Sequence, residues 1–281
     1  MNHSLSIIIP TYNRAHVLAR ALESIYAQQT TSFIVNLQVI VIDDGSTDNT
    51  AQLLEEQYPE VEYYYQINQG VSAARNLGLK HVKCEWVALL DSDDEWLPTK
   101  LERQFSALHE SELLVCHTDE IWIRNGVRVN QMKKHAKSGG WIFKKCLPLC
   151  AMSPSSIIIN RSVFTDVGEF DAKLPACEDY DLWLRICAKY EVAFVEDKLI
   201  NKYGGNEDQL SRQYWGMDRF RVVALEKILA TKLSDTNFEA AKAMLIKKLQ
   251  ILLNGAKKND NHELVKLCEI KLTTWQIECS M

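Results

Sequence analysis

Four short apolar runs alternate with helical segments over the first hundred residues. The runs cover 5–9, 39–42, 61–67 and 86–90 and are rich in β-branched or aromatic residues. Between the first two runs, apolar residues recur at helical spacing, at positions 17, 18, 21, 22 and 25. Strands that are apolar throughout are buried on both faces. The pattern therefore predicts an α/β fold, with a Rossmann-like, mostly parallel sheet flanked by helices.

Polar residues directly follow three of these predicted strands. Residues 11–14 follow the first run, 43–44 the second, and 91–94 the fourth. In open sheets of this kind, ligands bind at the carboxyl ends of the strands. We therefore expect the chemistry of the protein at this edge of the sheet.

The rest of the chain has a less regular pattern. A hairpin is expected where 121–123 and 127–129 flank Arg124-Asn125-Gly126, followed by a strand at 155–159 and a helix at 181–189. Two late strands are predicted at 192–195 and 199–203. Beyond Tyr214, two apolar stripes separated by a turn predict an antiparallel helical hairpin docked on the main domain.

Composition and charge exclude several classes of protein. The 281 residues are 47% hydrophobic and carry a net charge of −5, which argues against a protein that binds nucleic acid by neutralising phosphates. No apolar run reaches the roughly 18 residues of a membrane-spanning helix, and the N-terminus has neither a basic region nor a cleavage site. The eight cysteines lack C-x-x-C pairs and zinc spacing, so we expect most of them to be reduced core thiols.

Carboxylates at the predicted sheet edge indicate a cation site. Asp91 and Asp93 end a buried strand with D-x-D spacing, which places both carboxylates on the same side of it. Two like charges about 4 Å apart repel by roughly 4 kcal/mol at an effective dielectric of 20, and a divalent cation relieves this repulsion. Arg14 and Arg75 lie near predicted helix starts and suit an anionic ligand, with a surface ion pair as the alternative, favoured more for Arg14. Asp48 is expected to cap a helix instead.

Five blocks of the sequence resemble the family 2 glycosyltransferases of the GT-A fold. The blocks are SIIIPTYNR at 6–14, VIDDGSTD at 41–48, GVSAARN at 70–76, LDSDD at 90–94, and a segment from 160 to 185 that contains EDYDLWLR. The first four occur in the family's order and spacing. The resemblance reaches about residue 205, so the C-terminal helices lie outside it.

The resemblance implies a set of residues that bind the nucleotide sugar. This set is Pro10, Thr11, Tyr12, Arg14, Asp43, Asp44, Arg75, Asp91 and Ser92. Within it, Asp43 would face the base, most often uracil, and Arg75 would contact the nucleotide or its phosphates. Asp91 and Ser92 would lie near the ribose. The resemblance also implies that Asp93 ligates Mn²⁺ or Mg²⁺ bridging the diphosphate.

The same resemblance implies that Asp179 is the general base, which takes the proton of the acceptor hydroxyl. Glu178 is the fallback. A helix N-cap is the alternative role for Asp179, although Asp181 is predicted to be the better-placed cap. Many family members have a histidine where this chain has Asn206, so a third metal or phosphate contact is in doubt.

Together these features predict an inverting, metal-dependent glycosyltransferase. It would move a sugar from a nucleoside-diphosphate sugar to a hydroxyl of a glycan or lipid-linked glycan. Among such donors, a UDP-sugar is favoured. One base without a covalent nucleophile fits direct displacement. Two alternatives stay open: a catalytically silent sugar-nucleotide-binding module, and a sugar-1-phosphate nucleotidyltransferase, whose glycine-rich loop the first strand lacks. The fingerprints G-x-G-x-x-G and G-x-x-x-x-G-K-[ST] are also absent.

The predicted organisation is a GT-A domain over 1–213 and a C-terminal helical extension over 214–281. Within the domain, a nucleotide-sugar half reaches to about 110 and an acceptor half covers 111–213. The protein is expected in the cytoplasm, with the inner membrane surface as an alternative location. Lysines 247, 248, 257 and 258 are interpreted as a solvated helix surface, with peripheral membrane contact as the alternative. Trp183 and Trp215 are interpreted as core residues, with sugar stacking as the alternative.

Overall fold

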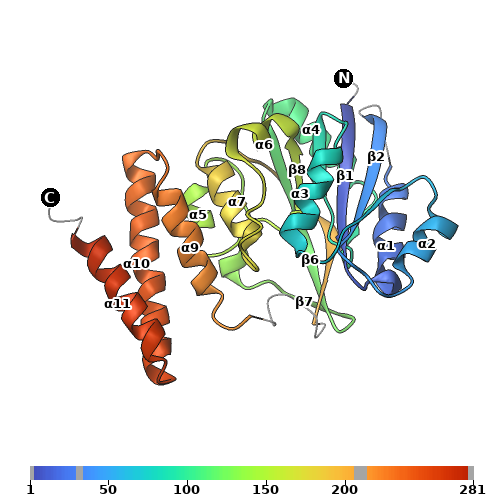
Figure 1. Cartoon of the computed structure of the whole chain (residues 1–281). Helices are drawn as coiled ribbons and strands as arrows, with labels where there is room; N and C mark the ends of the chain where they lie inside the picture. Colours follow the sequence, from blue (N-terminus) through green and yellow to red (C-terminus); the bar gives the residue numbers. More distant parts are fainter. Residues whose placement is uncertain (1–2, 30–33, 206–213, 278–281) are drawn as a thin grey trace.

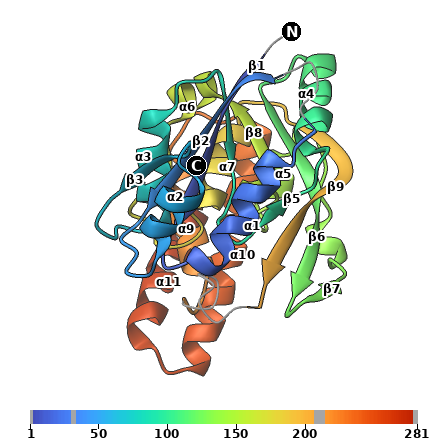
Figure 2. The ribbon, with the colours of Figure 1, turned by 90° about the vertical axis from the view of Figure 1, so that its right-hand side faces the viewer.

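The computed structural model describes residues 3–29, 34–205 and 214–277 (Figure 1). In this part of the chain, nine strands form one sheet in the order β3-β2-β1-β4-β8-β6-β9-β5, and β7 pairs with β6 beside this path. Helices cover both faces of the sheet (Figure 2). The predicted α/β fold with a flanked sheet is thus confirmed.

The bounds of the elements follow the chain. The strands are β1 (His3–Thr11), β2 (Ile34–Asp43), β3 (Glu62–Tyr65), β4 (Trp86–Leu89), β5 (Glu95–Trp96), β6 (Val115–Arg124), β7 (Val127–Val129), β8 (Ile157–Asn160) and β9 (Ala193–Gly204). The α-helices are α1 (Ala15–Tyr26), α2 (Thr50–Gln57), α3 (Val71–His81), α4 (Lys100–Ser111), α5 (Phe143–Cys146), α6 (Arg161–Val167), α7 (Glu178–Cys187), α9 (Asp218–Leu229), α10 (Asp235–Lys258) and α11 (His262–Ile277).

The first half of the sheet is parallel and buried on both faces. β1 pairs in parallel with β2 and β4, and β2 pairs in parallel with β3. Along β1, Ile7 and Ile9 pack into a core cluster with α1, α2 and α4, whereas Ile8 packs into the opposite cluster with α3 and α7. This two-sided burial explains why residues 7–9 of the strand are all apolar.

Helix α3 approaches β1 very closely because it contains Gly78. A Cβ atom at this position would overlap with the Ile8 side chain. The helix begins after Gly70, whose φ of 88° is accessible to glycine. Together these two glycines fix where α3 begins and how near it lies to the sheet, and α3 carries Arg75 into the site described below.

The second half of the sheet is mixed. β8 runs antiparallel to β4 and β6, whereas β9 runs parallel to β6. The prediction of two late strands is wrong, because residues 193–204 form the single strand β9. The exposed residues 196–198 interrupt the apolar pattern there, and register shifts near Asp119 let the pairing with β6 continue across them. The predicted hairpin is confirmed as β6–β7, with Asn125 and Gly126 both at positive φ.

The predicted C-terminal hairpin is confirmed as α10 and α11, with α9 between it and α7 (Figure 1). One core cluster extends from the sheet through α7 into these helices. Lys248 is not a solvated surface residue as predicted: its side chain is 9% exposed and lies 2.9 Å from Asp218. Trp183 is fully buried, as predicted, whereas Trp215 is 60% exposed and therefore not a core residue.

The cysteines of the described residues are free, and all but Cys150 are buried. This agrees with the prediction of reduced core thiols; Cys279 lies outside the described residues. None of the described helices has the length and apolarity needed to cross a membrane.

Candidate active site

A cleft of about 1130 Å³ opens at the carboxyl ends of β1 and β4 and the start of α3. It is lined by ten of the residues predicted for the site: Pro10, Thr11, Tyr12, Arg14, Asp44, Arg75, Asp91, Ser92, Asp93 and Asp179. The rest of the lining includes residues 68–72 and 74, residues 172–178, Pro154, the end of β9, Tyr214 and Met217. Segments up to about 200 residues apart in sequence thus meet at the edge where the sequence predicts the chemistry.

The loops after β1 and β2 are tied together by backbone and side-chain hydrogen bonds. The Asp44 N–H donates to the Thr11 carbonyl at 2.8 Å. Asn13 has a φ of 52°, and its N–H donates to Ser46 Oγ while its Oδ1 accepts from the Thr47 N–H, both at 2.8 Å. The loops after β1 and β2 form what we call the first wall of the cleft, and these contacts hold it in place without a ligand.

Asp43 and Asp44 have different surroundings. Asp43 is 1% exposed, accepts from the Ser46 N–H and the Tyr63 hydroxyl, and is not among the residues that line the cleft. Asp44 lines the cleft and accepts from the Gln69 and Gly70 N–H groups, both at 2.8 Å, ahead of α3. The predicted contact of Asp43 with a base stays a prediction.

Asp48 bonds to the starts of two helices, in line with its predicted capping role. Its Oδ1 accepts from the Thr50 N–H at 3.1 Å, and its Oδ2 accepts from the Ala15 N–H at 3.0 Å. The position that directly precedes α2 is Asn49, whose side chain makes no capping bond. Asp48 therefore serves both α1 and α2 through its side chain.

Acidic and basic side chains alternate across the cleft. Arg14 pairs with Asp93, while Arg75 lies 2.7 Å from Asp91 and 2.7 Å from Glu178. Burial by itself lowers the pKa of Arg75, but Asp91 and Glu178 outweigh this effect and raise it. Burial raises the pKa of Asp93; Arg14 opposes this rise and the charge of Asp91 adds to it. A ligand that enters this cleft meets the guanidinium groups of Arg14 and Arg75 next to several carboxylates.

The D-x-D pair fits a divalent ion that also binds a diphosphate. Asp91 and Asp93 both line the cleft, as the strand geometry predicts. Among the described residues, no group of three or more histidine, cysteine or acidic side chains could hold a metal by itself. Mg²⁺ typically takes one or two carboxylates and fills its other positions with substrate phosphates and water. Asp93 suits this mode, with Asp91 beside it.

The predicted base lies at the start of α7, on the opposite wall. Asp179 Oδ2 accepts from the Cys150 thiol at 3.0 Å, and Oδ1 accepts from the Tyr180 N–H at 2.6 Å. Glu178, the fallback base, is buried and ion-paired with Arg75. Asp179 is therefore the more accessible of the two carboxylates for an acceptor.

The prediction that Asp181 caps α7 is wrong. The helix begins at Glu178, and the residue before it is Cys177, which has a φ of 62°. Asp181 is buried in the first turn, where it lies 2.8 Å from Arg185 and 2.7 Å from Lys227. It fastens α7 to α9 and takes no part in the cleft.

Sequence reasoning missed two residues on this wall, Cys150 and Lys202. Cys150 contacts Asp179 from the segment between α5 and β8. Lys202 lines the cleft from β9, in a stretch that the sequence marks only as a strand before two glycines. A lysine inside an apolar strand is the one signal that could have found it. Asn206, the position where many family members have histidine, lies outside the described residues.

Comparison with known sequences identifies the family. The family model described as "Glycosyl transferase family 2" matches residues 6–166, which is more than half of the chain, and that of "Glycosyltransferase like family 2" matches 127–255. An uncharacterized glycosyltransferase from Rickettsia felis is 28% identical over 69% of this chain, a match that spans about a third (32%) of that relative. A UDP-Glc:α-D-GlcNAc-diphosphoundecaprenol β-1,3-glucosyltransferase from Escherichia coli is 27% identical over 75% of this chain and 80% of the relative.

Comparison with solved structures supports the same fold. S. aureus TarS in complex with UDP-GlcNAc has a TM-score of 0.69 and 21% identity, covering 88% of this chain and 71% of TarS. A mannosyltransferase from Pyrobaculum calidifontis in complex with GDP-Man and Mn²⁺ has a TM-score of 0.62 and 17% identity, covering 98% of this chain and 85% of that one. The sheet, the cleft at its carboxyl edge and the family match agree, and the chain belongs to glycosyl transferase family 2.

Proposed function

We propose that this chain is an inverting glycosyltransferase that takes a sugar from a UDP-sugar. The observation that carries the proposal is the convergence of Asp91, Asp93 and Asp179 on one cleft, from two segments about 90 residues apart. The first two carboxylates suit the donor and its metal, and the third suits the acceptor. The relative from Escherichia coli and TarS, named with UDP-Glc and UDP-GlcNAc, support the choice of a UDP-sugar.

The donor would bind along the first wall of the cleft. Pro10, Thr11, Tyr12 and Asp44 line the part between β1 and α3, where the nucleoside fits. Arg14 and Arg75 suit the phosphates, since a guanidinium donates to two oxygens at once. In this arrangement Asp43 would support the nucleotide base from behind the cleft lining, and Ser92 would lie beside the ribose.

A bound Mn²⁺ or Mg²⁺ supplies Lewis-acid stabilisation of the charge on the departing diphosphate. Asp93 is the residue that would hold it, with Asp91 as its neighbour. Because Arg14 and Arg75 pair with these carboxylates in the structure, donor phosphates would compete for both arginines. Until the donor binds, Arg14 would neutralise Asp93 and Arg75 would neutralise Asp91.

The acceptor hydroxyl would lose its proton to Asp179. A positioned carboxylate base contributes a factor of about 10²–10⁴ to the rate. The Cys150 thiol and the Tyr180 N–H hold the two carboxylate oxygens, so the side chain is oriented before the acceptor binds. With no covalent nucleophile invoked, transfer in one displacement inverts the sugar carbon. The acceptor class we propose is a hydroxyl of a glycan, free or carried on a lipid.

We further propose that three segments of the chain have separate functions. Residues 1–110 would bind the nucleotide sugar, 111–213 would bind the acceptor, and 214–281 would support α7 from outside. α9 packs against α7, the helix that carries Asp179, which favours this supporting role.

The test is a calorimetric screen of UDP, GDP, CDP and dTDP with Mn²⁺, Mg²⁺ or EDTA. UDP should bind in the presence of metal, and EDTA or Asp93→Ala should weaken this binding at least tenfold. Asp166→Ala, which removes an exposed carboxylate on α6, is the matched control and should bind UDP like the wild type. The absence of nucleotide binding under every condition would refute the proposal.

A further inference from the structure

One cation in the cleft has no role in the proposed mechanism. Lys202 lies on β9 beside Trp122 of β6, and its partly buried side chain lines the cleft. The groups whose charges act on it are Glu120, Asp94, Asp91 and Cys150. Asp91 and Asp94 line the cleft together with Lys202, whereas Glu120 and Cys150 do not.

Lys202 carries its proton in this position. Burial by itself lowers the pKa of this lysine, but Glu120, Asp94 and Asp91 outweigh it and raise the pKa above its usual value. A permanent positive charge therefore belongs to the lining of the cleft.

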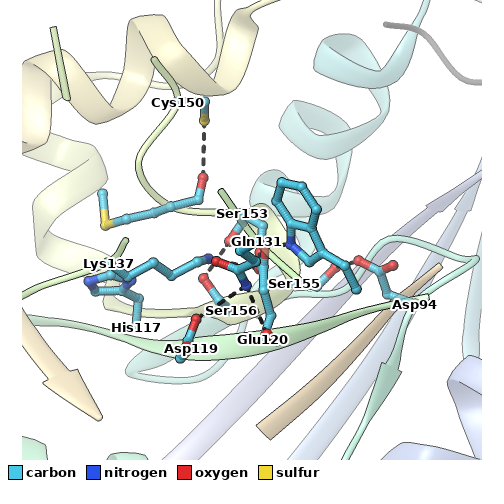
Figure 3. Close-up of polar contacts among 12 residues, drawn as sticks. Asp94, His117, Asp119, Glu120, Gln131, Lys137, Cys150, Ser153, Ser155 and Ser156 are labelled. Carbon is cyan, nitrogen blue, oxygen red and sulfur yellow. Dashed lines mark hydrogen bonds and ion pairs between the residues drawn. The ribbon is translucent and has the colours of Figure 1, made fainter. Parts of the chain in front are cut away.

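The carboxylates around Lys202 already have closer partners (Figure 3). Glu120 lies 2.7 Å from Lys137 and 2.5 Å from the Ser153 hydroxyl. Asp94 accepts from the Ser155 hydroxyl at 2.6 Å and from the Tyr203 N–H at 3.1 Å. Each of these carboxylates thus has its hydrogen bonds without Lys202.

Lys202 itself is left without such contacts. In the part of the chain that the structure describes, its Nζ makes no hydrogen bond and no ion pair. An ammonium group has three donors and no acceptor. Leaving donors unmatched is costly inside a protein, whereas on the wall of an open cleft they remain available to a ligand with several oxygen acceptors.

We propose that Lys202 donates to the diphosphate of the sugar donor and stabilises the negative charge that grows on it as the sugar leaves. This inference rests on the proposed function, since it requires a nucleoside-diphosphate donor in the cleft. The sugar carbon loses its bond to the diphosphate oxygen and gains one to the acceptor oxygen, while the acceptor proton passes to Asp179. Lys202 keeps its own proton throughout and acts as a fixed positive charge.

A purely structural lysine is the rival explanation. In that case Lys202 would only balance the charges of Glu120 and Asp94. The geometry favours the ligand contact, because Glu120 already has a closer counter-ion in Lys137. The two explanations make different predictions for ligands with and without phosphate.

The test measures binding of UDP, UMP and uridine, each with Mn²⁺, by calorimetry. Lys202→Met should weaken UDP about tenfold to a hundredfold, as expected for loss of one or two charged hydrogen bonds, and leave uridine within twofold. Lys202→Arg should restore much of the UDP affinity because it restores the charge. Lys198→Met, an exposed lysine of the same strand, should change nothing.

Lys137→Met is the control for a structural role. It removes the ion pair with Glu120 from a residue that does not line the cleft, so it should lower the unfolding temperature but keep the ratio of UDP to uridine affinity. The inference is overturned if Lys202→Met binds UDP like the wild type, or if it loses UDP and uridine equally. Failure of the proposed function would look different, because the wild type would then bind no nucleotide, and both proposals would fall.

Discussion

Two lysines of this protein, Lys202 in the cleft and Lys100 on α4, have pKa values shifted in opposite directions. Lys202, at the floor of the cleft, is surrounded by Glu120, Asp94 and Asp91, which raise its pKa. Lys100, on α4, is fully buried and has Gln104 as its hydrogen-bond partner at 2.6 Å, with the Trp96 ring 3.9 Å away. Burial lowers the pKa of Lys100 to about 7.

The difference shows what holds a charge inside this fold. Burial disfavours the charged form in both regions. Of these two regions, only the cleft brings carboxylates, from β6 and from the loop between β4 and β5, near enough to reverse the effect. The lysine in the cleft therefore keeps its charge, whereas the lysine of α4 has a pKa of about 7.

The largest expected effect concerns Asp179, a carboxylate of the cleft that makes no ion pair with the described residues. Asp179→Asn should lower the rate of sugar transfer by a factor of about 10²–10⁴, because the amide cannot accept the acceptor's proton. The affinity for UDP should stay within twofold. The measurement is UDP release from a UDP-sugar with acceptor, and Asp166→Asn serves as the exposed control. A rate close to that of the wild type would assign the base elsewhere.

The second test removes a cation from the charged region. Arg75→Met leaves Glu178 buried without its counter-ion and Asp91 without its partner, so the free energy of unfolding should fall by about 3–5 kcal/mol. Urea unfolding measures this value. Arg103→Met is the control: Arg103 pairs with Asp197 on the surface, with both side chains at least half exposed, and its loss should cost about 0–1 kcal/mol.

Adding Glu178→Gln to Arg75→Met sharpens this test. The double variant should recover part of the lost stability, because the buried uncompensated charge is gone. If the double variant is no more stable than Arg75→Met, the loss comes from packing and not from charge.

The smallest expected effect concerns Lys100. Its pKa is about 7 in the folded state and about 10.5 in the unfolded state. Between these values the unfolded chain binds a proton that the folded chain does not, so stability rises with pH, by at most about 1.4 kcal/mol per pH unit. Lys100→Met should remove this rise, as measured by urea unfolding from pH 7 to 9.5. The exposed Lys144→Met should keep it; a rise that survives in Lys100→Met would show that Lys100 is not its source.

Much of the first wall could be predicted from sequence because each part of it is local. A buried strand that ends in a polar block places that block at the edge of the sheet, whatever the rest of the chain does. For this reason residues 10–14 and 91–93 lie where the pattern predicts them. The motif around Arg75 follows the same logic, since Gly70 starts a helix at that edge.

The second wall could not be predicted, because it depends on contacts between distant segments. The pattern of β9 breaks at residues 196–198, and pairing with β6 carries the strand on to Lys202. Asp181 has the composition of a helix cap, yet its neighbours Arg185 and Lys227 draw it into an ion-pair network. Cys150 meets Asp179 only because α7 packs against α5.

The sequence by itself therefore determined the fold class, the carboxyl edge as the site, and the donor motifs, because period, strand ends and helix starts are properties of neighbouring residues. The tertiary structure alone decided which charges are compensated. It brought Lys202 among three carboxylates and left Lys100 without any, and it paired Arg75 with both Asp91 and Glu178. Electrostatic energies depend on distance and burial in space, and residue spacing along a chain specifies neither.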